Sequence, residues 1–252
     1  MNGIKRNLRS ALTALLILAA LGCSKRMISP QSIFEKETVT EVSSNEDTID
    51  SASIRYLALG DSYTVGASVA LSLNFPSQLS RSLEKEFDVN VELQLIATSG
   101  WRTDNLLNAL KNAATSPPYE LVTLLIGVNN QYQDIPFSTY ELEFTELFNR
   151  ALTLAGGNIN HLIIISIPDW GYTPFGESFD RTQISKEIDE YNSFAKRTAD
   201  KFNVTFIDIT DITRRGLEET ELVASDNLHP SALAYKLFVD RMTPIIFSQL
   251  KN

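Results

Sequence analysis

The stretch IRYLALGDS, residues 54–62, decides the fold class of this 252-residue chain. Residues 54–59 are mostly apolar and have the length of a buried strand, which ends at Gly60. A helical pattern follows over residues 75–86, with apolar side chains spaced along one face. A strand followed by an amphipathic helix is the repeating unit of α/β proteins.

The same alternation continues along the chain. Further strands are predicted at residues 91–96, 121–126, 161–167 and 204–207, and further helices at residues 103–114, 138–155, 180–202 and 230–250. Pro244 is expected to kink or split the last helix, because proline lacks the backbone N–H that a helix interior needs. Five strands separated by helices predict an α/β fold with a five-stranded parallel sheet and right-handed crossovers.

The composition excludes several classes of protein. The chain is 43% hydrophobic and 21% charged, which excludes wholesale disorder and a polytopic membrane protein. Its 22 basic and 31 acidic residues give a formal charge of −9, which argues against a general nucleic-acid binder. The single cysteine, Cys23, excludes an intrachain disulfide framework, and the two histidines, His161 and His229, leave little room for a metal centre. We expect neither a metal nor another cofactor.

Residues 1–22 have the layout of a secretory signal peptide. Three basic residues precede an apolar stretch, residues 11–21, that is too short to span a bilayer comfortably. The segment ends in Ala20-Leu21-Gly22-Cys23. This resembles the lipobox of bacterial lipoproteins, in which the cysteine is lipidated and becomes the new N-terminus. The alternatives are an ordinary signal peptide, or an N-terminal anchor helix, with an incidental cysteine.

Cleavage before Cys23 would leave a tether and one domain. Residues 23–52 are rich in Ser, Thr and Glu and predict a flexible tether, while residues 53–252 contain all the predicted strands. Loss of three basic residues changes the formal charge from −9 to −12. The predicted location is the bacterial cell envelope, with a lipid anchor holding the domain toward the periplasm or the exterior.

Residues with reactive side chains follow the predicted strands directly. Ser62 follows the first strand, Gly100 the second and Asn129 the third, while Asp226 and His229 lie just before the last helix. In open parallel sheets, ligands bind beyond the carboxyl ends of the strands. We therefore expect these five residues to converge at one edge of the sheet.

This set of residue types suits nucleophilic catalysis. A serine hydroxyl needs a neighbouring base, which His229 can supply for Ser62, and Asp226 can fix the orientation of the imidazole. Pro230 is expected at the first helical position, where it would pin His229 at a helix start. The backbone N–H groups of Ser62 and Gly100 and the side-chain amide of Asn129 would stabilise an oxyanion. A glycine at position 100 suits this role, because the absence of a Cβ lets its backbone N–H approach the substrate.

Four sequence blocks resemble the SGNH, or GDSL-type, hydrolase family. The blocks are LGDSYTVG (59–66), ATSGWRT (97–103), IGVNN (126–130) and DNLHP (226–230). The resemblance spans roughly residues 54–250. It implies a three-layer, flavodoxin-like α/β/α fold and a metal-free ester hydrolase.

The resemblance assigns a role to each of five residues. It carries over Ser62 as the nucleophile, His229 as the base and Asp226 as its orienting acid, and it carries over Gly100 and Asn129 as oxyanion donors. One departure is Asn130, where the family commonly has Asp. We expect Asn130 to alter local hydrogen bonding as a core or loop-bracing residue.

Trp101, Arg102 and Trp170 are the candidates for the substrate pocket. Trp101 and Arg102 lie beside the oxyanion glycine, and Trp170 belongs to an aromatic loop, residues 168–176, after the fourth strand. Aromatic side chains at such a place can stack on a sugar or line an acyl pocket. The alternative is a loop that packs on itself. Residues 131–133 are a further candidate for the pocket entrance.

Three functions remain open at this level. The first is a serine esterase acting on an acetylated carbohydrate, a lysophospholipid or another short acyl ester. The second is an O-acyltransferase with the same triad, and the third is a non-catalytic binding lipoprotein on this scaffold. Fold does not fix the substrate. The sequence also leaves the oligomeric state open.

Overall fold

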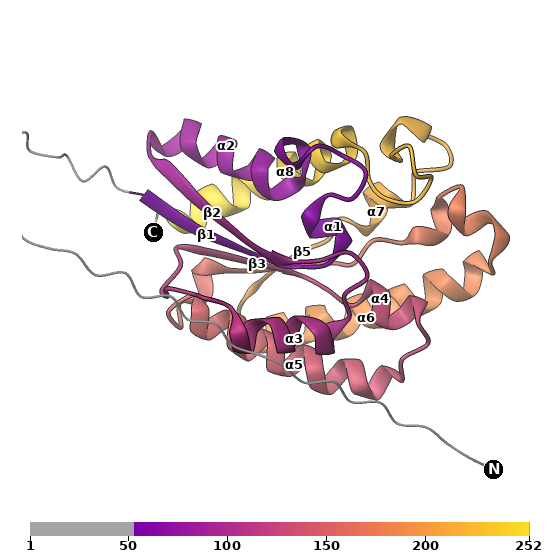
Figure 1. The fold of residues 1–252 in the computed structure, drawn as a ribbon, viewed down its shortest axis with the longest axis horizontal. Coiled ribbons are helices and arrows are strands. Elements are labelled where there is room, and N and C mark those ends of the chain that lie inside the picture. Colours follow the sequence, from indigo (N-terminus) through magenta and orange to yellow (C-terminus); the bar gives the residue numbers. More distant parts are fainter. Residues whose placement is uncertain (1–52, 252) are drawn as a thin grey trace, which may run out of the picture. The chain divides into compact units, whose positions relative to one another are not determined.

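The computed structural model describes residues 53–251, in which five parallel strands lie between two layers of helices (Figure 1). The strands are β1 (Ser53–Gly60), β2 (Asn90–Ala97), β3 (Leu121–Leu125), β4 (Leu162–Ile165) and β5 (Thr205–Ile207). Their order in the sheet is β2-β1-β3-β4-β5, which is the flavodoxin-like order. The predicted five-stranded parallel sheet is confirmed. The predicted signal peptide, Cys23 and the predicted tether lie outside the described residues.

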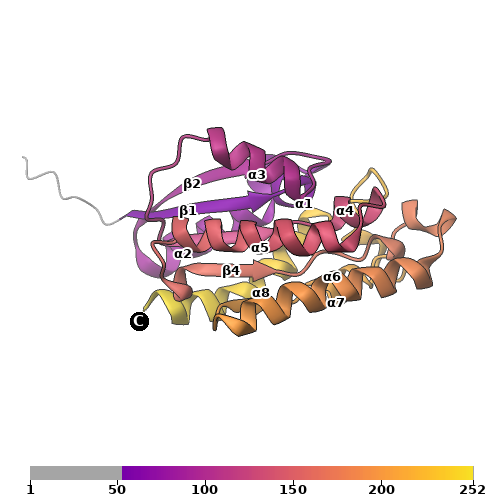
Figure 2. The ribbon, with the colours of Figure 1, turned by 90° about the horizontal axis from the view of Figure 1, so that it is seen from below.

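Five long helices cover the two faces of the sheet. Helices α2 (Phe75–Phe87) and α8 (Ala232–Leu250) pack together on one face, and α3 (Thr103–Asn112), α5 (Phe137–Leu154) and α6 (Arg181–Lys201) cover the other (Figures 1 and 2). The shorter helices are α1 (Ser62–Val65), α4 (Val128–Tyr132) and α7 (Thr210–Thr213), and the 3-10 turns are η1 (Leu71–Leu73), η2 (Ile159–His161), η3 (Trp170–Tyr172), η4 (Phe175–Ser178) and η5 (Thr220–Leu222). In the described part of the chain, no helix combines the length and apolarity that crossing a membrane requires.

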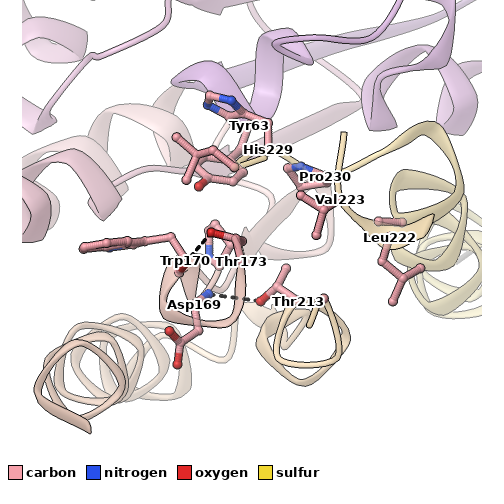
Figure 3. Close-up of a pocket in the computed structure, with 13 residues that line it drawn as sticks. Tyr63, Asp169, Trp170, Thr173, Thr213, Leu222, Val223, His229 and Pro230 are labelled. Carbon is pink, nitrogen blue, oxygen red and sulfur yellow. Dashed lines mark hydrogen bonds between the residues drawn. The ribbon is translucent and has the colours of Figure 1, made fainter. Parts of the chain in front are cut away.

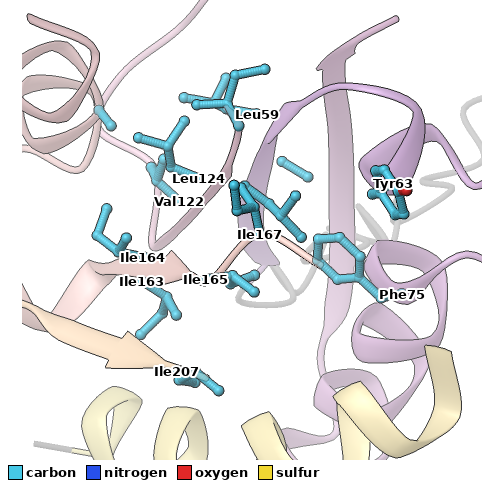
Figure 4. Packing of buried hydrophobic residues seen from close by; sticks show 14 of the residues in the cluster. Leu59, Tyr63, Phe75, Val122, Leu124, Ile163, Ile164, Ile165, Ile167 and Ile207 are labelled. Atoms are coloured by element: carbon cyan, nitrogen blue, oxygen red, sulfur yellow. The ribbon is translucent and has the colours of Figure 1, made fainter. Parts of the chain in front are cut away.

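The central strands β3 and β4 are apolar except for Thr123, because both faces of the sheet are covered. Every residue of β3 and β4 is buried. Figure 4 shows Leu59, Leu124 and the isoleucines of β4 packed in this core. Each such side chain contributes about 1.5–3 kcal/mol relative to an exposed position. This core fixes the strands whose ends carry the candidate site.

The structure differs from the predictions at Pro244, for which a kink or a split was expected, and at the start of the fourth strand. Pro244 does not split α8, which runs unbroken from Ala232 to Leu250. The helix tolerates the lost hydrogen bond because Phe238, Met242 and Ile246 are fully buried against the rest of the fold. The fourth strand begins at Leu162, and the preceding His161 belongs to the turn η2.

The register of the sheet brings three strand ends level. Gly60 is the partner of Ala97 in β2 and of Leu125 in β3. The segments that follow these three residues therefore leave the sheet at the same edge. These segments carry Ser62, Gly100 and Asn129.

Candidate active site

Ser62 is the first residue of α1, which folds back sharply on the end of β1. Asp61 caps this helix, because its carboxylate accepts a hydrogen bond from the Tyr63 N–H at 2.9 Å. Gly60 makes the sharp fold possible. A Cβ at that position would lie 2.1 Å from Thr64 Oγ1 and 2.5 Å from the Leu125 carbonyl oxygen. The sharp turn from β1 into α1 places Ser62 in the wall of a cavity.

His229 is presented by a tight loop that precedes α8. The His229 carbonyl accepts from the Ala224 N–H at 2.7 Å, and Val223 and Pro230 form an antiparallel bridge across the loop. The expectation that Pro230 starts the helix is wrong: α8 begins at Ala232, with Ser231 as its cap. Pro230 suits the bridge because its ring fixes φ at about −65°, which an edge position in an extended pair accepts. His229 is thus held by a loop rather than by a helix start.

The structure brings Ser62, His229 and Asp226 together. His229 Nε2 lies 2.9 Å from Ser62 Oγ, and His229 Nδ1 lies 2.6 Å from Asp226 Oδ2. A carboxylate only accepts hydrogen bonds, so the ring proton resides on Nδ1 and leaves Nε2 free to accept the serine proton. The Tyr63 ring packs against the imidazole with its centroid 5.0 Å away. This arrangement can activate the hydroxyl as a nucleophile.

Four donors surround the Asp226 carboxylate. Oδ1 accepts from the backbone N–H groups of Leu228 and His229, each at 3.0 Å. Oδ2 accepts from the His229 ring and from the Ser68 hydroxyl, which lies 2.6 Å away. Partial burial on its own raises the pKa of the Asp226 carboxyl, but these hydrogen bonds, led by that of Ser68, outweigh it and hold the pKa well below its usual range. Asp226 is therefore ionised whenever His229 works as a base.

The three residues predicted to supply oxyanion donors, Ser62, Gly100 and Asn129, all line one cavity. As the first residue of α1, Ser62 has a backbone N–H without a partner inside the helix. The Asn129 amide donates to the Trp101 carbonyl at 3.0 Å and to Asp61 Oδ2 at 3.5 Å, so the hydrogen on the longer contact is the one available to an oxyanion. Gly100 has φ +82°, and an added Cβ would meet no atom within 4 Å. The left-handed backbone, rather than crowding at Cβ, is thus what favours glycine here.

Asp61 is a fully buried carboxyl beneath the candidate site. Burial raises its pKa to about 7, although the hydrogen bonds from Tyr63 and Asn129 act in the opposite direction. Asp61 therefore both caps α1 and contacts an oxyanion donor. The same side chain thus serves as a helix cap and as a brace of the candidate site.

This raised pKa predicts how stability depends on pH. The unfolded carboxyl titrates near pH 3.9, so between about pH 4 and 7 the folded state binds more protons and stability falls as the pH rises. Asp61→Asn retains an acceptor for Tyr63 and is expected to remove this decline, which amounts to a few kcal/mol. Urea unfolding of both proteins at pH 5 and pH 7.5 measures the difference. An equal decline in both would show that Asp61 is not its source.

Asn130 braces the loop that carries Gly100. Its side chain is fully buried, accepts from the Thr103 N–H at 3.0 Å and donates to Thr103 Oγ1 at 2.6 Å. The Thr103 hydroxyl in turn donates to Glu143. An aspartate at this position could not donate to Thr103. The bracing role predicted for Asn130 is confirmed.

The three pocket candidates have different positions. Trp170 lines the cavity at Ser62, whereas Trp101 and Arg102 are not among its lining residues. The Arg102 guanidinium pairs with Asp104 at 2.9 Å and donates to Gln133 Oε1 at 2.7 Å. Its charge is thus paired with Asp104, and Arg102 does not line the cavity.

Sequence reasoning missed Ser68. Its φ of +66° is unusual for a residue other than glycine. Its hydroxyl contacts Asp226, which lies 158 positions further along the sequence. No local pattern indicates such a contact.

In residues 53–251, no cluster of three or more His, Cys, Asp or Glu side chains could hold a metal ion.

The chain matches the model of one known protein family. A family model, the GDSL-like lipase/acylhydrolase family, matches residues 58–237. The chain belongs to this family. No curated protein matches the chain.

Solved structures share the fold at low identity. The acetylxylan esterase Axe2 from Geobacillus stearothermophilus is 17% identical, over 77% of this chain and 94% of that chain, with a TM-score of 0.61. A lipolytic G-D-S-L family member from Veillonella parvula is 19% identical, over 77% and 97%, with a TM-score of 0.60. The lipase Lip_vut3 from a goat rumen metagenome is also 19% identical, over 76% and 97%, with a TM-score of 0.61. These similarities establish the SGNH hydrolase fold.

Proposed function

We propose that this protein is a serine esterase that hydrolyses a carboxylic ester through an acyl-enzyme. The single observation that carries the proposal is the position of His229, whose two ring nitrogens lie within hydrogen-bond distance of Ser62 and Asp226. Family membership supports the same reaction class. The candidate substrates are an acetylated carbohydrate, a lysophospholipid or another acyl ester.

The proposed reaction has two halves. In the first, Ser62 Oγ attacks the ester carbonyl carbon while His229 Nε2 takes the hydroxyl proton. The carbonyl oxygen becomes an oxyanion beside Gly100 and Asn129, and the C–O bond to the alcohol breaks as His229 returns the proton to the leaving oxygen. In the second, His229 takes a proton from water as the water attacks the acyl carbon. The bond from that carbon to Ser62 Oγ then breaks, His229 returns the proton to Oγ, and the acid is released. All protons in this sequence move between Ser62, His229, the substrate and water.

Covalent labelling tests the proposal. A fluorophosphonate is expected to add one equivalent per protein and to modify the peptide that contains Ser62, as read by mass spectrometry. Ser99, an exposed serine in the same cavity, serves as an internal control and is expected to stay unmodified, because no base contacts it in the described structure. Labelling of Ser99 instead, or no labelling at all, would rule out Ser62 as the activated nucleophile.

We further propose that Cys23 anchors the protein to a membrane of the bacterial cell envelope through a lipid. Support comes from the sequence alone, in which the only cysteine follows the apolar stretch of a signal peptide. In a bacterial host, Cys23→Ser is expected to move the protein from the membrane pellet to the soluble fraction. Ser24→Ala is the matched control and is expected to stay in the pellet. Membrane retention of Cys23→Ser equal to that of the wild type would argue against lipidation.

A further inference from the structure

The cavity at Ser62 is apolar away from its reactive end. Its volume is about 230 Å³. Beyond the candidate catalytic groups, its main walls come from Val128, Tyr132, Trp170, Phe175 and Leu228. Among the described residues, no Asp, Glu, Lys or Arg lines it. Such a wall suits a hydrocarbon group, because it offers few partners for the hydroxyl groups of a sugar.

Aromatic rings form a continuous cluster on one side of this cavity. The Trp170 ring meets Tyr132 edge-on at a centroid distance of 5.3 Å, and it lies 5.9 Å from Phe175 and 5.0 Å from Phe179. Tyr132 and Phe179 are 46% and 45% exposed. Large apolar side chains left this exposed beside a pocket indicate a ligand-contacting surface.

Trp170 is the fixed member of the cluster. Its indole Nε1 donates to Gln131 Oε1 at 2.7 Å, and Gln131 Nε2 donates to Glu187 Oε2 at 2.7 Å. The preceding residue, Asp169, is fully buried and pairs with Arg214 at 2.9 Å. These contacts on both sides of the loop lock the indole in one orientation.

A second, smaller cavity shares part of its wall with the site cavity. Its volume is about 20 Å³, and its walls include Thr213, Leu222 and Val223 (Figure 3). Trp170 lines both cavities. Tyr63, Leu228 and His229 also line both, so the two cavities are neighbours.

We infer that the acyl chain of the substrate occupies the site cavity and that Trp170 limits its length, so the enzyme prefers medium-chain acyl esters to acetyl esters. The inference rests on the proposed esterase function and narrows its substrate class. An acetyl group would leave most of the cavity unfilled. Each further methylene that is buried contributes roughly fourfold to kcat/KM until the chain reaches Trp170.

A series of nitrophenyl esters with a constant leaving group tests this inference. Wild type is expected to hydrolyse the octanoyl ester at least tenfold faster in kcat/KM than the acetyl ester, and to lose activity on the palmitoyl ester. Trp170→Leu is expected to move the optimum toward longer chains, because a smaller side chain in the wall enlarges the site cavity. Phe202→Leu changes a partly exposed aromatic residue that lines neither cavity and is expected to keep the wild-type profile.

A second variant covers the case in which Trp170→Leu fails to fold. Trp170→Phe keeps a ring but lacks the hydrogen bond to Gln131, and we expect a smaller shift in the same direction. A wild-type preference for the acetyl ester, or an unchanged chain-length order in the folded Trp170 variants, would overturn the inference. Fluorophosphonate labelling of Ser62 separates the two ideas: labelling with the wrong chain-length profile refutes only the acyl-length inference, and absence of labelling refutes the esterase.

Discussion

Replacing Ser62 by alanine is expected to reduce ester hydrolysis on the order of 10⁴- to 10⁶-fold, to a rate close to background. The variant removes the only hydroxyl that contacts His229 Nε2 in the described structure. Neither half of the proposed reaction can proceed without it, because no acyl-enzyme forms. Release of nitrophenol from a short-chain nitrophenyl ester measures the effect.

The fold should survive this change. Ser62 Oγ is a small group at the cavity wall, and α1 keeps its cap on Asp61. Ser82→Ala is a matched control, because its hydroxyl bonds only to the Gln78 carbonyl within α2. Thermal unfolding should be similar in all three proteins. Equal hydrolysis rates for wild type and Ser62→Ala would remove the nucleophile from the mechanism.

Asp226→Asn is expected to lower kcat by roughly 10²- to 10⁴-fold with little change in KM. All four groups that reach the Asp226 carboxylate are hydrogen-bond donors. An asparagine offers one oxygen, so its amide NH₂ must face at least one donor pair. If the NH₂ faces the imidazole, Nδ1 becomes the acceptor and Nε2 carries the proton, which is the wrong tautomer for a base.

Stability gives this variant a second readout. The pKa of Asp226 is lowered in the folded state, so the ionised group stabilises the fold above about pH 4 and this contribution is lost as the pH falls. Asp226→Asn should therefore be less stable than wild type near pH 7 and more nearly equal to it in acid. Asp240→Asn, on the exposed face of α8, is the control expected to affect neither property appreciably. A kcat within threefold of wild type would contradict the orienting role.

The sequence predicted most of the sheet because buried strands have a simple signature. Residues 121–126 are apolar except for Thr123, and β3 occupies 121–125 with both faces covered. The convergence of Ser62, Gly100 and Asn129 was predictable for a related reason. Each residue follows a parallel strand within four positions, and carboxyl ends of parallel strands share one edge.

The remaining features depend on contacts that leave no local pattern. Helices α1 and α4 have four and five residues, too few for a helical period to show. The bond from Ser68 to Asp226 joins segments 158 positions apart, and its geometry depends on a left-handed backbone at a serine. Pro230 illustrates an ambiguity, because proline suits both a first helical turn and an extended bridge. The pairing of Pro230 with Val223, which the sequence does not indicate, determines that it forms the bridge.

The loop that presents His229 determines when, during folding, the site becomes complete. The imidazole follows the nucleophile by 167 positions, and its loop is closed by the bridge between Val223 and Pro230. A chain folded only as far as β5 has Ser62 at the end of β1 but no group to deprotonate it. Under the proposed mechanism, reactivity toward esters thus begins only when the last loop joins the folded sheet.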